Sequence, residues 1–349
     1  MQFYKNKANI RLVSAAEIIL TNDCNLRCKY CYSAEYRSKQ VVSCERINEI
    51  VELLFKNAFV KKTLGISPRV NISFLGGGEP TLAWRELQYC IECVKKESQK
   101  HDIPYDISIT TNGCLLLNKL DYLINENIRV KVSIDGLEEI NDATRIDAES
   151  NGTYNKITDS IDYLNNANSW FSLGIVVGSH NYMYLEEFVR YAINRWKNVK
   201  KIDFSYLQEN NTTFENGLKP IDYIEFLKIK NHFIEILINS KIGIYNQYVS
   251  IYDFLLKNRY YRCPKITGDK IVLNCDDQIY RCTRLAEGKR VFEQREEYAH
   301  ENCSNCRFHD YWMLYNDNCV YTNDKKINKI RYCEFIKNTY RKAMQKVSY

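Results

Sequence analysis

Three cysteines stand close together near the start of the chain, in the segment TNDCNLRCKYCYS. Cys24, Cys28 and Cys31 follow the spacing Cys-x3-Cys-x2-Cys. A structural zinc site takes four ligands and a disulfide framework takes an even number of cysteines, so three cysteines leave one position unfilled. Three thiolates can bind three irons of a [4Fe–4S] cube and leave the fourth iron open to a ligand. A zinc site completed from elsewhere and plain buried thiols are the alternatives.

Further candidate residues follow the next strand-like segments along the chain. They are GGGEP at 76–80, TTNG at 110–113 and SIDG at 133–136. The run GGGEPTL lacks the Gly-Lys-Ser/Thr ending of a P-loop and does not match Gly-x-Gly-x-x-Gly. Its glycines would let the backbone approach a ligand closely, and Glu79 could accept hydrogen bonds from an amino group.

Strand-like and helix-like segments alternate from residue 15 to about 207, and these elements must position the motifs. Six segments rich in β-branched or aromatic residues are expected strands: 16–21, 70–76, 106–112, 129–136, 171–178 and 201–207. Helical spacing is expected around Ile47–Leu54, Trp84–Val94, Ile157–Leu164 and Leu185–Ala192. This alternation predicts an α/β fold with a parallel sheet and right-handed crossovers. Six units are too few for a closed eightfold barrel, so we expect a partial (β/α)6 TIM-like barrel with its site at the carboxyl ends of the strands.

The second half of the chain has a different character. A helical stretch with Ile224, Leu227, Phe233, Ile234 and Leu237 on one apolar face is followed by a region rich in cysteine. Seven of the 14 cysteines lie between Cys263 and Cys333, and in a reducing compartment such clustering favours metal or iron–sulfur ligation. The predicted division is an N-terminal extension (1–14), the partial barrel (15–210), a helical connector (211–260) and a small cysteine-rich C-terminal iron–sulfur domain (261–349).

Composition excludes several classes of protein. The chain of 349 residues is 45% hydrophobic and 26% charged, as in an ordinary globular protein, and its formal charge of +6 is spread along the sequence. No basic patch with interleaved aromatic residues stands out, so nucleic acid is not an expected partner. The longest apolar stretches, such as 171–178, are far shorter than the ~20 residues of a spanning helix. We therefore expect no membrane partner and a cytoplasmic location.

Together the motifs resemble those of the radical S-adenosylmethionine (SAM) enzymes. CNLRCKYCY carries that family's cysteine signature, with an aromatic residue before the third cysteine and Tyr32 after it. GGGEP, TTNG, SIDG, NDATR (141–145) and NGTYNKI (151–157) follow in the family's order, over about residues 15 to 207. The resemblance implies that Cys24, Cys28 and Cys31 hold a [4Fe–4S] cluster whose open iron binds the amino and carboxylate groups of SAM.

The same resemblance implies the residues that contact SAM. Gly77, Gly78 and Glu79 would face the amino group, Ser133 and Asp135 the ribose region, and Arg145 the carboxylate. Tyr32 would lie beside the adenine, and Asn112 is a further expected cofactor-binding residue. The implied activity is reductive cleavage of SAM to a 5′-deoxyadenosyl radical that abstracts hydrogen from a substrate. A reductant such as flavodoxin or ferredoxin would be a partner, and no side chain is assigned as the catalytic acid, base or hydrogen donor.

The cysteine-rich region resembles the SPASM/twitch extension of peptide-modifying radical SAM enzymes. That resemblance implies one or two auxiliary [4Fe–4S] clusters, with ligands among Cys263, Cys275, Cys282, Cys303, Cys306, Cys319 and Cys333. NCDDQIYRC (274–282) looks like a short hairpin of that extension, with Asp277 in place of the usual glycine. A zinc-stapled domain is the alternative. Cys44, Cys90, Cys93 and Cys114 are expected to be buried small hydrophobes.

The expected function is maturation of a ribosomally made precursor peptide (a RiPP), by forming a thioether or carbon–carbon crosslink or by epimerising a residue. An anaerobic sulfatase maturase shares both halves of this architecture. Thr283 counts against it, because an aspartate usually follows the hairpin cysteine in that subfamily. A second alternative, from another class, is an iron–sulfur electron-transfer protein that does not use SAM.

Overall fold

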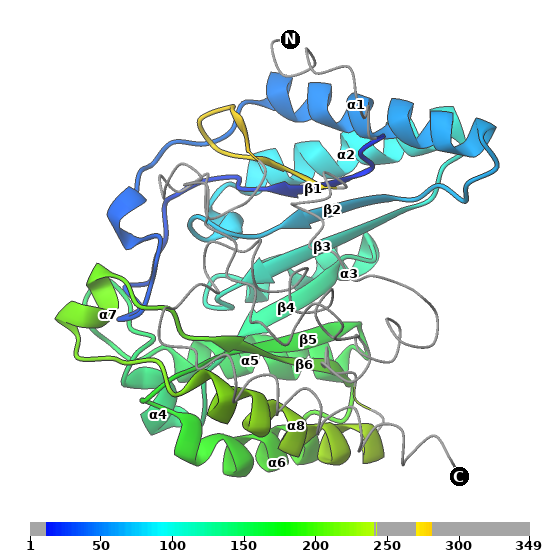
Figure 1. The fold of residues 1–349 in the computed structure, drawn as a ribbon. Coiled ribbons are helices and arrows are strands. Elements are labelled where there is room, and N and C mark those ends of the chain that lie inside the picture. The colour runs from blue at the N-terminus through cyan, green and yellow to red at the C-terminus, as the bar shows by residue number, and fades with distance from the viewer. Residues whose placement is uncertain (1–11, 241, 243–269, 281–349) are drawn as a thin grey trace, which may run out of the picture.

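A computed structural model describes residues 12–240, 242 and 270–280. Among these residues eight strands form one sheet in the order β6-β5-β4-β3-β2-β1-β7-β8 (Figure 1). Neighbours from β1 to β6 pair in parallel, which confirms the predicted six-stranded parallel arrangement. The strands are β1 (Ala15–Ile18), β2 (Val70–Phe74), β3 (Tyr105–Thr111), β4 (Arg129–Ser133), β5 (Phe171–Val177), β6 (Val199–Tyr206), β7 (Ile271–Leu273) and β8 (Ile279–Tyr280).

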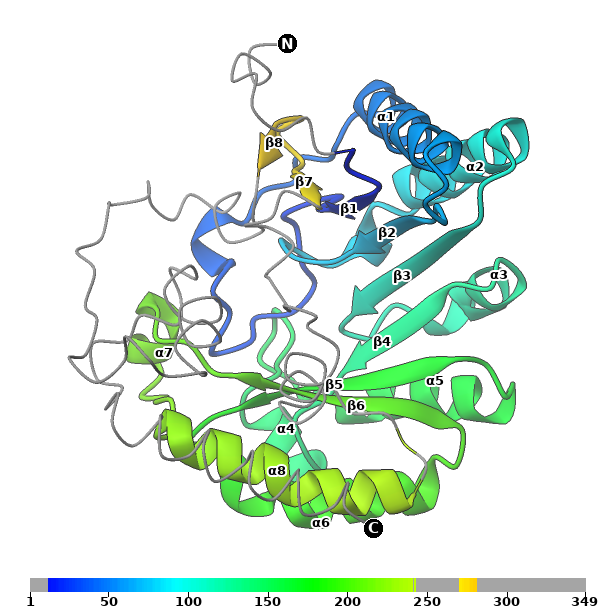
Figure 2. The same cartoon turned by 45° about the vertical axis from the view of Figure 1, so that its right-hand side comes forward.

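Helices follow the strands and cover one face of the sheet, as Figure 2 shows for α1, α2, α3 and α5. The helices are α1 (Cys44–Thr63), α2 (Trp84–His101), α3 (Leu120–Asn125), α4 (Glu138–Asp142), α5 (Tyr154–Asn166), α6 (Leu185–Arg195), α7 (Asn211–Glu215) and α8 (Tyr223–Asn239). Side chains alternate along each strand between the two faces of the sheet. In β4, Val130 and Val132 are buried in the core with the helices, whereas Lys131 and Ser133 belong to the opposite, inner face.

Local sequence explains where the helices begin, end and pack. The Ser43 hydroxyl accepts a hydrogen bond from the Arg46 N–H at 3.2 Å and so caps the start of α1. In α8, Ile224, Leu227, Phe233 and Leu237 are buried as their spacing predicts. The side chain of Ile234, and the part of the expected helical stretch beyond residue 242, lie outside what the structure describes. None of the described helices is both long and apolar enough to cross a membrane.

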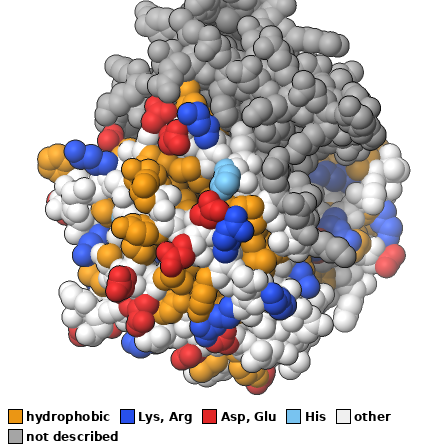
Figure 3. Space-filling model, turned by 90° about the horizontal axis from the view of Figure 1, so that it is seen from below, with side chains coloured by type: hydrophobic (Ala, Val, Ile, Leu, Met, Phe, Trp, Pro, Cys, Tyr) orange, Lys and Arg blue, Asp and Glu red, His pale blue; other side chains and the backbone are white. Residues whose placement is uncertain are grey.

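Charges of both signs are mixed with apolar side chains on the surface shown in Figure 3. Many charged side chains of the described residues belong to short-range ion pairs. Glu186 of α6, for example, contacts Arg190 at 2.7 Å and His232 of α8 at 3.1 Å. Exposed pairs of this kind contribute little to stability, so the apolar core and the sheet hold these helices in place.

The sheet does not end at β1. β7 pairs in parallel with β1, and β8 returns beside β7 in antiparallel pairing. The strand expected at 16–21 ends at Ile18. The next amide, Ile19 N–H, still donates to the Leu273 carbonyl at 2.8 Å. The expected hairpin is present as β7–β8, but it is part of the main sheet. A division at residue 261 stays a prediction for the residues around it.

The turn of this hairpin is tied to the start of α1. Asp277 has a φ of 61°, in the left-handed region that aspartate, asparagine and glycine enter most readily. Its carboxylate accepts a hydrogen bond from the Ser43 N–H at 2.8 Å, and its carbonyl accepts one from Arg46 Nε at 3.0 Å. The aspartate therefore replaces the usual glycine and adds an anchor that glycine lacks.

Asp277→Ala should loosen the hairpin, because alanine loses the side-chain bond and pays the cost of a left-handed backbone. Together these effects amount to about 2 kcal/mol. Hydrogen exchange of the 271–273 amides should accelerate accordingly. Asp277→Asn, which keeps an acceptor and tolerates this conformation, should exchange much like the native chain. Equal exchange in all three proteins would contradict the anchoring role.

Candidate functional site

The loop that carries the three cysteines is held by backbone hydrogen bonds on both of its sides. On one side Gly78 N–H donates to the Thr21 carbonyl and Glu79 N–H to the Asp23 carbonyl, both at 2.8 Å. On the other side, Arg27 N–H donates to the Ile146 carbonyl at 2.7 Å and Lys29 N–H to the Thr144 carbonyl at 2.9 Å. The GGGEP and NDATR segments therefore clamp the cysteine loop between them.

The glycines of GGGEP are required by this clamp. A β-carbon on Gly78 would lie 1.7 Å from the Asp23 carbonyl oxygen, and one on Gly77 would lie 2.4 Å from Ile19 Cγ2. Gly77 also has a φ of +64°. The sequence predicts that these glycines let the backbone approach a ligand closely. In the structure they let the backbone approach the cysteine loop closely. The predicted contact of Gly77 and Gly78 with the SAM amino group stays a prediction.

The three thiols suit an iron–sulfur cluster. Cys24, Cys28 and Cys31 are half-buried on one loop, and none of the three is in a disulfide. Leu26 N–H and Asn112 Nδ2 point at Cys24 Sγ, at 3.4 Å and 3.8 Å, and such donors stabilise a metal-bound thiolate. Burial raises the pKa of Cys24 and of Cys28 to about 11, so the free thiols are protonated near neutral pH. Cluster binding would displace these protons.

Glu79 joins the tips of β2 and β3. Its Oε1 accepts hydrogen bonds from Thr81 N–H at 3.1 Å and from the Thr81 and Thr111 hydroxyls at 2.7 Å. Its Oε2 accepts one from Asn112 N–H at 2.7 Å. Burial raises the pKa of this carboxyl, and the hydrogen bonds oppose that shift. The same Asn112 donates from Nδ2 to Asn25 Oδ1 at 2.8 Å, so Glu79 fixes a residue that contacts the cysteine loop.

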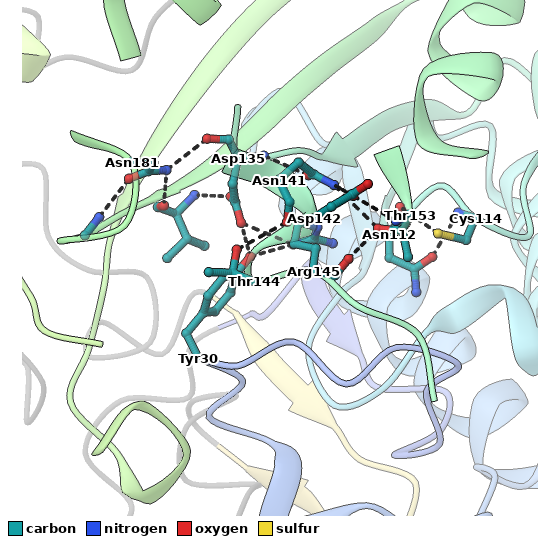
Figure 4. A network of polar contacts seen from close by, with 12 residues as sticks. Tyr30, Asn112, Cys114, Asp135, Asn141, Asp142, Thr144, Arg145, Thr153 and Asn181 are labelled. Carbon is teal, nitrogen blue, oxygen red and sulfur yellow. Dashed lines mark hydrogen bonds and ion pairs between the residues drawn. The ribbon is translucent and has the colours of Figure 1, made fainter. Parts of the chain in front are cut away.

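A buried polar network links the cysteine loop to β4 and β5 (Figure 4). The Tyr30 hydroxyl donates to Asp135 and accepts a hydrogen bond from Arg145 Nη1 at 2.7 Å. The other Asp135 oxygen accepts from Val176 N–H at 2.9 Å. Burial raises the pKa of Tyr30, which keeps its hydroxyl protonated as the donor. The predicted contact of Asp135 with the ribose region stays a prediction, because here its oxygens serve protein donors.

The NDATR and NGTYNKI segments hold Arg145 in place. Asp142 Oδ1 accepts from Thr153 N–H at 2.8 Å and Tyr154 N–H at 2.9 Å, which caps α5. The Thr153 hydroxyl donates to the Arg145 carbonyl at 2.6 Å. Arg145 Nε is buried and has no hydrogen-bond partner among the described residues. A buried guanidinium N–H of this kind fits an anionic partner, as the resemblance implies for the SAM carboxylate.

Three residues of this site are not predicted by the sequence motifs. Tyr30 enters the signature only as the aromatic residue before the third cysteine, and neither His180 nor Asn181 belongs to a predicted motif. His180 stacks on Tyr30 with ring centroids 5.6 Å apart, and its buried ring nitrogens have no partner among the described residues. Burial lowers the pKa of His180. Asn181 Nδ2 donates to the Asp135 and Val176 carbonyls at 3.0 Å and 2.9 Å. The position of His180 and Asn181 could have identified them, because they follow the carboxyl end of β5 just as the other motifs follow the carboxyl ends of their strands.

The remaining predicted residues fall into three groups. Ser133 is the last residue of β4, and Tyr32 lies half-buried in the cysteine loop. Cys275 is buried in the β7–β8 turn, whereas Cys263, Cys282, Cys303, Cys306, Cys319 and Cys333 lie outside the described residues. Cys90 and Cys93 are buried as expected, but Cys44 and Cys114 are only half-buried. Cys114 is held beside the site, since its N–H donates to Asn112 Oδ1 at 3.0 Å.

The chain is similar in sequence to known proteins. The family model described as the Radical SAM superfamily matches residues 18–192, half of the chain. An uncharacterized protein of Methanocaldococcus jannaschii is 30% identical over 269 residues, which cover 76% of this chain and 83% of that protein. A cysteine-type anaerobic sulfatase-maturating enzyme of Clostridium perfringens is 25% identical over 325 residues, covering 82% of this chain and 84% of that enzyme.

Two solved structures share the fold. The structure of anSMEcpe with bound AdoMet and Cp18Cys peptide gives a TM-score of 0.69 at 19% identity, covering 96% of this chain and 97% of that one. Streptococcus suis SuiB bound to precursor peptide SuiA gives a TM-score of 0.57 at 14% identity, covering 91% of this chain and 67% of that one.

Gly78→Ala should abolish cluster binding at the cysteine loop, because the added methyl group would overlap the Asp23 carbonyl and separate the two backbones. Iron content and the visible absorption of reconstituted protein measure this loss. Gly65→Ala is the control. At Gly65 no atom lies within 4 Å of the new carbon, and its φ of +72° adds a backbone strain of about 1 kcal/mol that Gly78→Ala, which has no left-handed φ, does not carry. Normal iron loading of Gly78→Ala would refute the clamp.

Tyr30→Phe should destabilise the protein by about 1–3 kcal/mol, because it removes a hydrogen-bond donor from the buried Asp135 carboxylate. Urea unfolding gives the change in free energy. Tyr163→Phe removes a similar bond to Asp121 on the exposed surface and should cost no more than about 0.5 kcal/mol. Equal changes in the free energy of unfolding would show that the buried hydrogen bond stabilises the protein no more than the exposed one.

Proposed function

The chain belongs to the radical SAM superfamily, and we propose that it modifies a ribosomally made peptide, forming a thioether or carbon–carbon crosslink or epimerising a residue. Enzymes of this family use a [4Fe–4S] cluster and SAM, and here Cys24, Cys28 and Cys31 would hold the cluster. When bound, the reduced cluster supplies the electron that cleaves SAM and so provides the radical that abstracts hydrogen from the substrate.

The observation that carries the peptide assignment is that the similarity to a sulfatase-maturating enzyme extends beyond residues 18–192, the part that matches the family model. The family model ends at residue 192, whereas the alignment with the Clostridium perfringens enzyme covers 82% of the chain. Two structures with the same fold hold peptides, Cp18Cys in one and SuiA in the other. A peptide substrate is the class that these proteins have in common.

The chain's own residues would bind and orient SAM. Arg145 offers its buried Nε to the carboxylate, and the Tyr30 hydroxyl holds that guanidinium beside Asp135. Among the described residues, Glu79 Oε2 accepts one hydrogen bond, from Asn112 N–H. A carboxylate oxygen can accept a second, and the amino group of SAM would donate it. Ser133 and Tyr32 would complete the ribose and adenine contacts.

Sulfatase maturation is the second candidate, and a specific observation favours it. Relatives that carry this name match most of the chain, as the 82% coverage shows. Thr283, which argues against it, lies outside the described residues. The alternative of an electron carrier without SAM is set aside, because the chain is a member of an enzyme family that uses SAM.

The cysteine-rich region 261–349 is proposed as a SPASM/twitch-like domain with one or two auxiliary [4Fe–4S] clusters. Its support is the cysteine spacing and the hairpin at 271–280, which has the form expected for that extension. A flavodoxin or ferredoxin as reductant and a cytoplasmic location belong to the same proposal.

A triple variant, Cys24→Ala/Cys28→Ala/Cys31→Ala, should lose both SAM cleavage and peptide modification while it keeps auxiliary iron. Anaerobic protein with a strong reductant is assayed for 5′-deoxyadenosine. If a short peptide gene lies beside this one, its peptide is then co-expressed and weighed by mass spectrometry.

Loss of the mass of two hydrogen atoms would indicate a crosslink, and deuterium uptake from heavy water at otherwise unchanged mass would indicate epimerisation. An unmodified neighbour peptide, together with oxidation of a sulfatase-derived cysteine peptide, would instead establish the second candidate. SAM cleavage by the triple variant would refute the cluster assignment.

A further inference from the structure

The inner face of the sheet carries a charged cluster that the proposed radical chemistry does not use. Strand pairing brings its members into two rows across β4, β5 and β6. One row is Lys131, Ser172 and Lys201, and the next is Ser133, Gly174 and Asp203. Paired residues of neighbouring strands share a face, so all these side chains start on the face of Ser133. The row of Lys131, Ser172 and Lys201 therefore lies about 7 Å below the predicted SAM contact at Ser133.

Gly174 lets a lysine of β4 reach across β5. A β-carbon at Gly174 would lie 3.3 Å from Lys131 Cδ, so the glycine leaves the space that the lysine stem uses. Lys131 Nζ then contacts Asp203 Oδ2 at 2.5 Å, and Lys201 Nζ contacts Asp203 Oδ1 at 2.8 Å. The Asp203 carboxylate of β6 thus contacts both ammonium groups.

The cluster has more positive than negative charge. Lys230 of α8 interacts with both Asp203 and Lys201, and burial lowers its pKa while Asp203 opposes that shift. Three lysines thus surround one aspartate. The Lys131 and Lys201 side chains remain 35% and 32% exposed, whereas Asp203 is 12% exposed. The two lysine side chains are therefore more accessible than the carboxylate that they contact.

Ser172 provides an independent sign of an absent partner. It lies between Lys131 and Lys201 in the row and is 1% exposed. Its hydroxyl oxygen is buried with no hydrogen-bond partner among the described residues. Buried hydroxyls in folded proteins are normally paired, so a polar group supplied from outside would satisfy it.

We propose that Lys131, Ser172 and Lys201 bind a carboxylate of the peptide substrate and so fix its position beneath SAM. The carboxylate would accept charge-assisted hydrogen bonds from the two ammonium groups and one from the Ser172 hydroxyl, and it would neutralise the excess charge. An acidic side chain and the carboxyl terminus of the peptide share this chemistry. This inference rests on the proposed function, since it assumes a peptide substrate.

The test uses three pools of synthetic peptides and the cluster-loaded, full-length protein. Two pools are blocked at both ends and differ only by Glu or Gln at one position; the third has Gln and a free carboxyl terminus. Immobilised protein is equilibrated with all three pools, and the bound peptides are counted by mass spectrometry. The Glu pool, the free-terminus pool or both should be retained about tenfold over the blocked Gln pool.

Lys131→Met should remove this preference, whereas Lys131→Arg, which keeps the charge, should retain it. Lys56→Met is the matched control, because Lys56 is an exposed lysine of α1 paired with Glu52. If native protein retains the blocked Gln pool as well as the other two pools, the proposal is overturned. This comparison needs no variant. An undiminished preference in Lys131→Met would overturn it as well.

Addition of SAM and reductant to the bound peptides tests the proposed function separately. Carboxylate-dependent binding without any mass change would count against peptide modification and leave the binding site standing. Modification of peptides that bind regardless of a carboxylate would support the function and refute this site.

Discussion

The pair of backbone hydrogen bonds between GGGEP and the cysteine loop is the constraint on which the site depends. They form only because two glycines allow one backbone to pass against another, with the Asp23 carbonyl where the Gly78 side chain would otherwise be. A loop of thiols needs such support, because cysteines spread over eight residues do not by themselves adopt the geometry of a cluster. The strand ends supply it with main-chain atoms, whose positions the parallel sheet already fixes.

Buried charge forms the second level of organisation. Asp135 and Arg145 come from different segments, and the hydroxyl of Tyr30, within the cysteine loop, stands between them. Burying such charges is costly unless every one of them is paired and hydrogen-bonded. That cost makes the network sensitive to geometry, so the cysteine loop, β4 and the segment before α5 must adopt one arrangement together.

Much of this arrangement could be predicted from the sequence, for physical reasons. Apolar periodicity predicts the six parallel strands and the helices α1, α2, α5 and α6, though not the short α3 and α4, and parallel strands bring their carboxyl ends to one edge. The Cys24, Glu79, Asn112, Asp135 and Arg145 segments therefore had to meet. Their partners could not be predicted, because spacing does not show that Glu79 accepts from Thr111 or that Tyr30 bridges Asp135 and Arg145. The pairing of β7 with β1 could not be predicted either. A strand of three residues is too short to show an alternating pattern, and its partner β1 lies at the other side of most of the chain.

The β7–β8 hairpin has a consequence for how the chain can be divided. β1 would be an edge strand without it, with a row of unpaired N–H and C=O groups beside the cysteine loop. Because β7 covers that row, a protein truncated before residue 270 would present an open sheet edge, which is a template for association with other chains. The segment 271–273 thus covers the open edge of the first strand, so two parts of the chain far apart in sequence depend on each other against association.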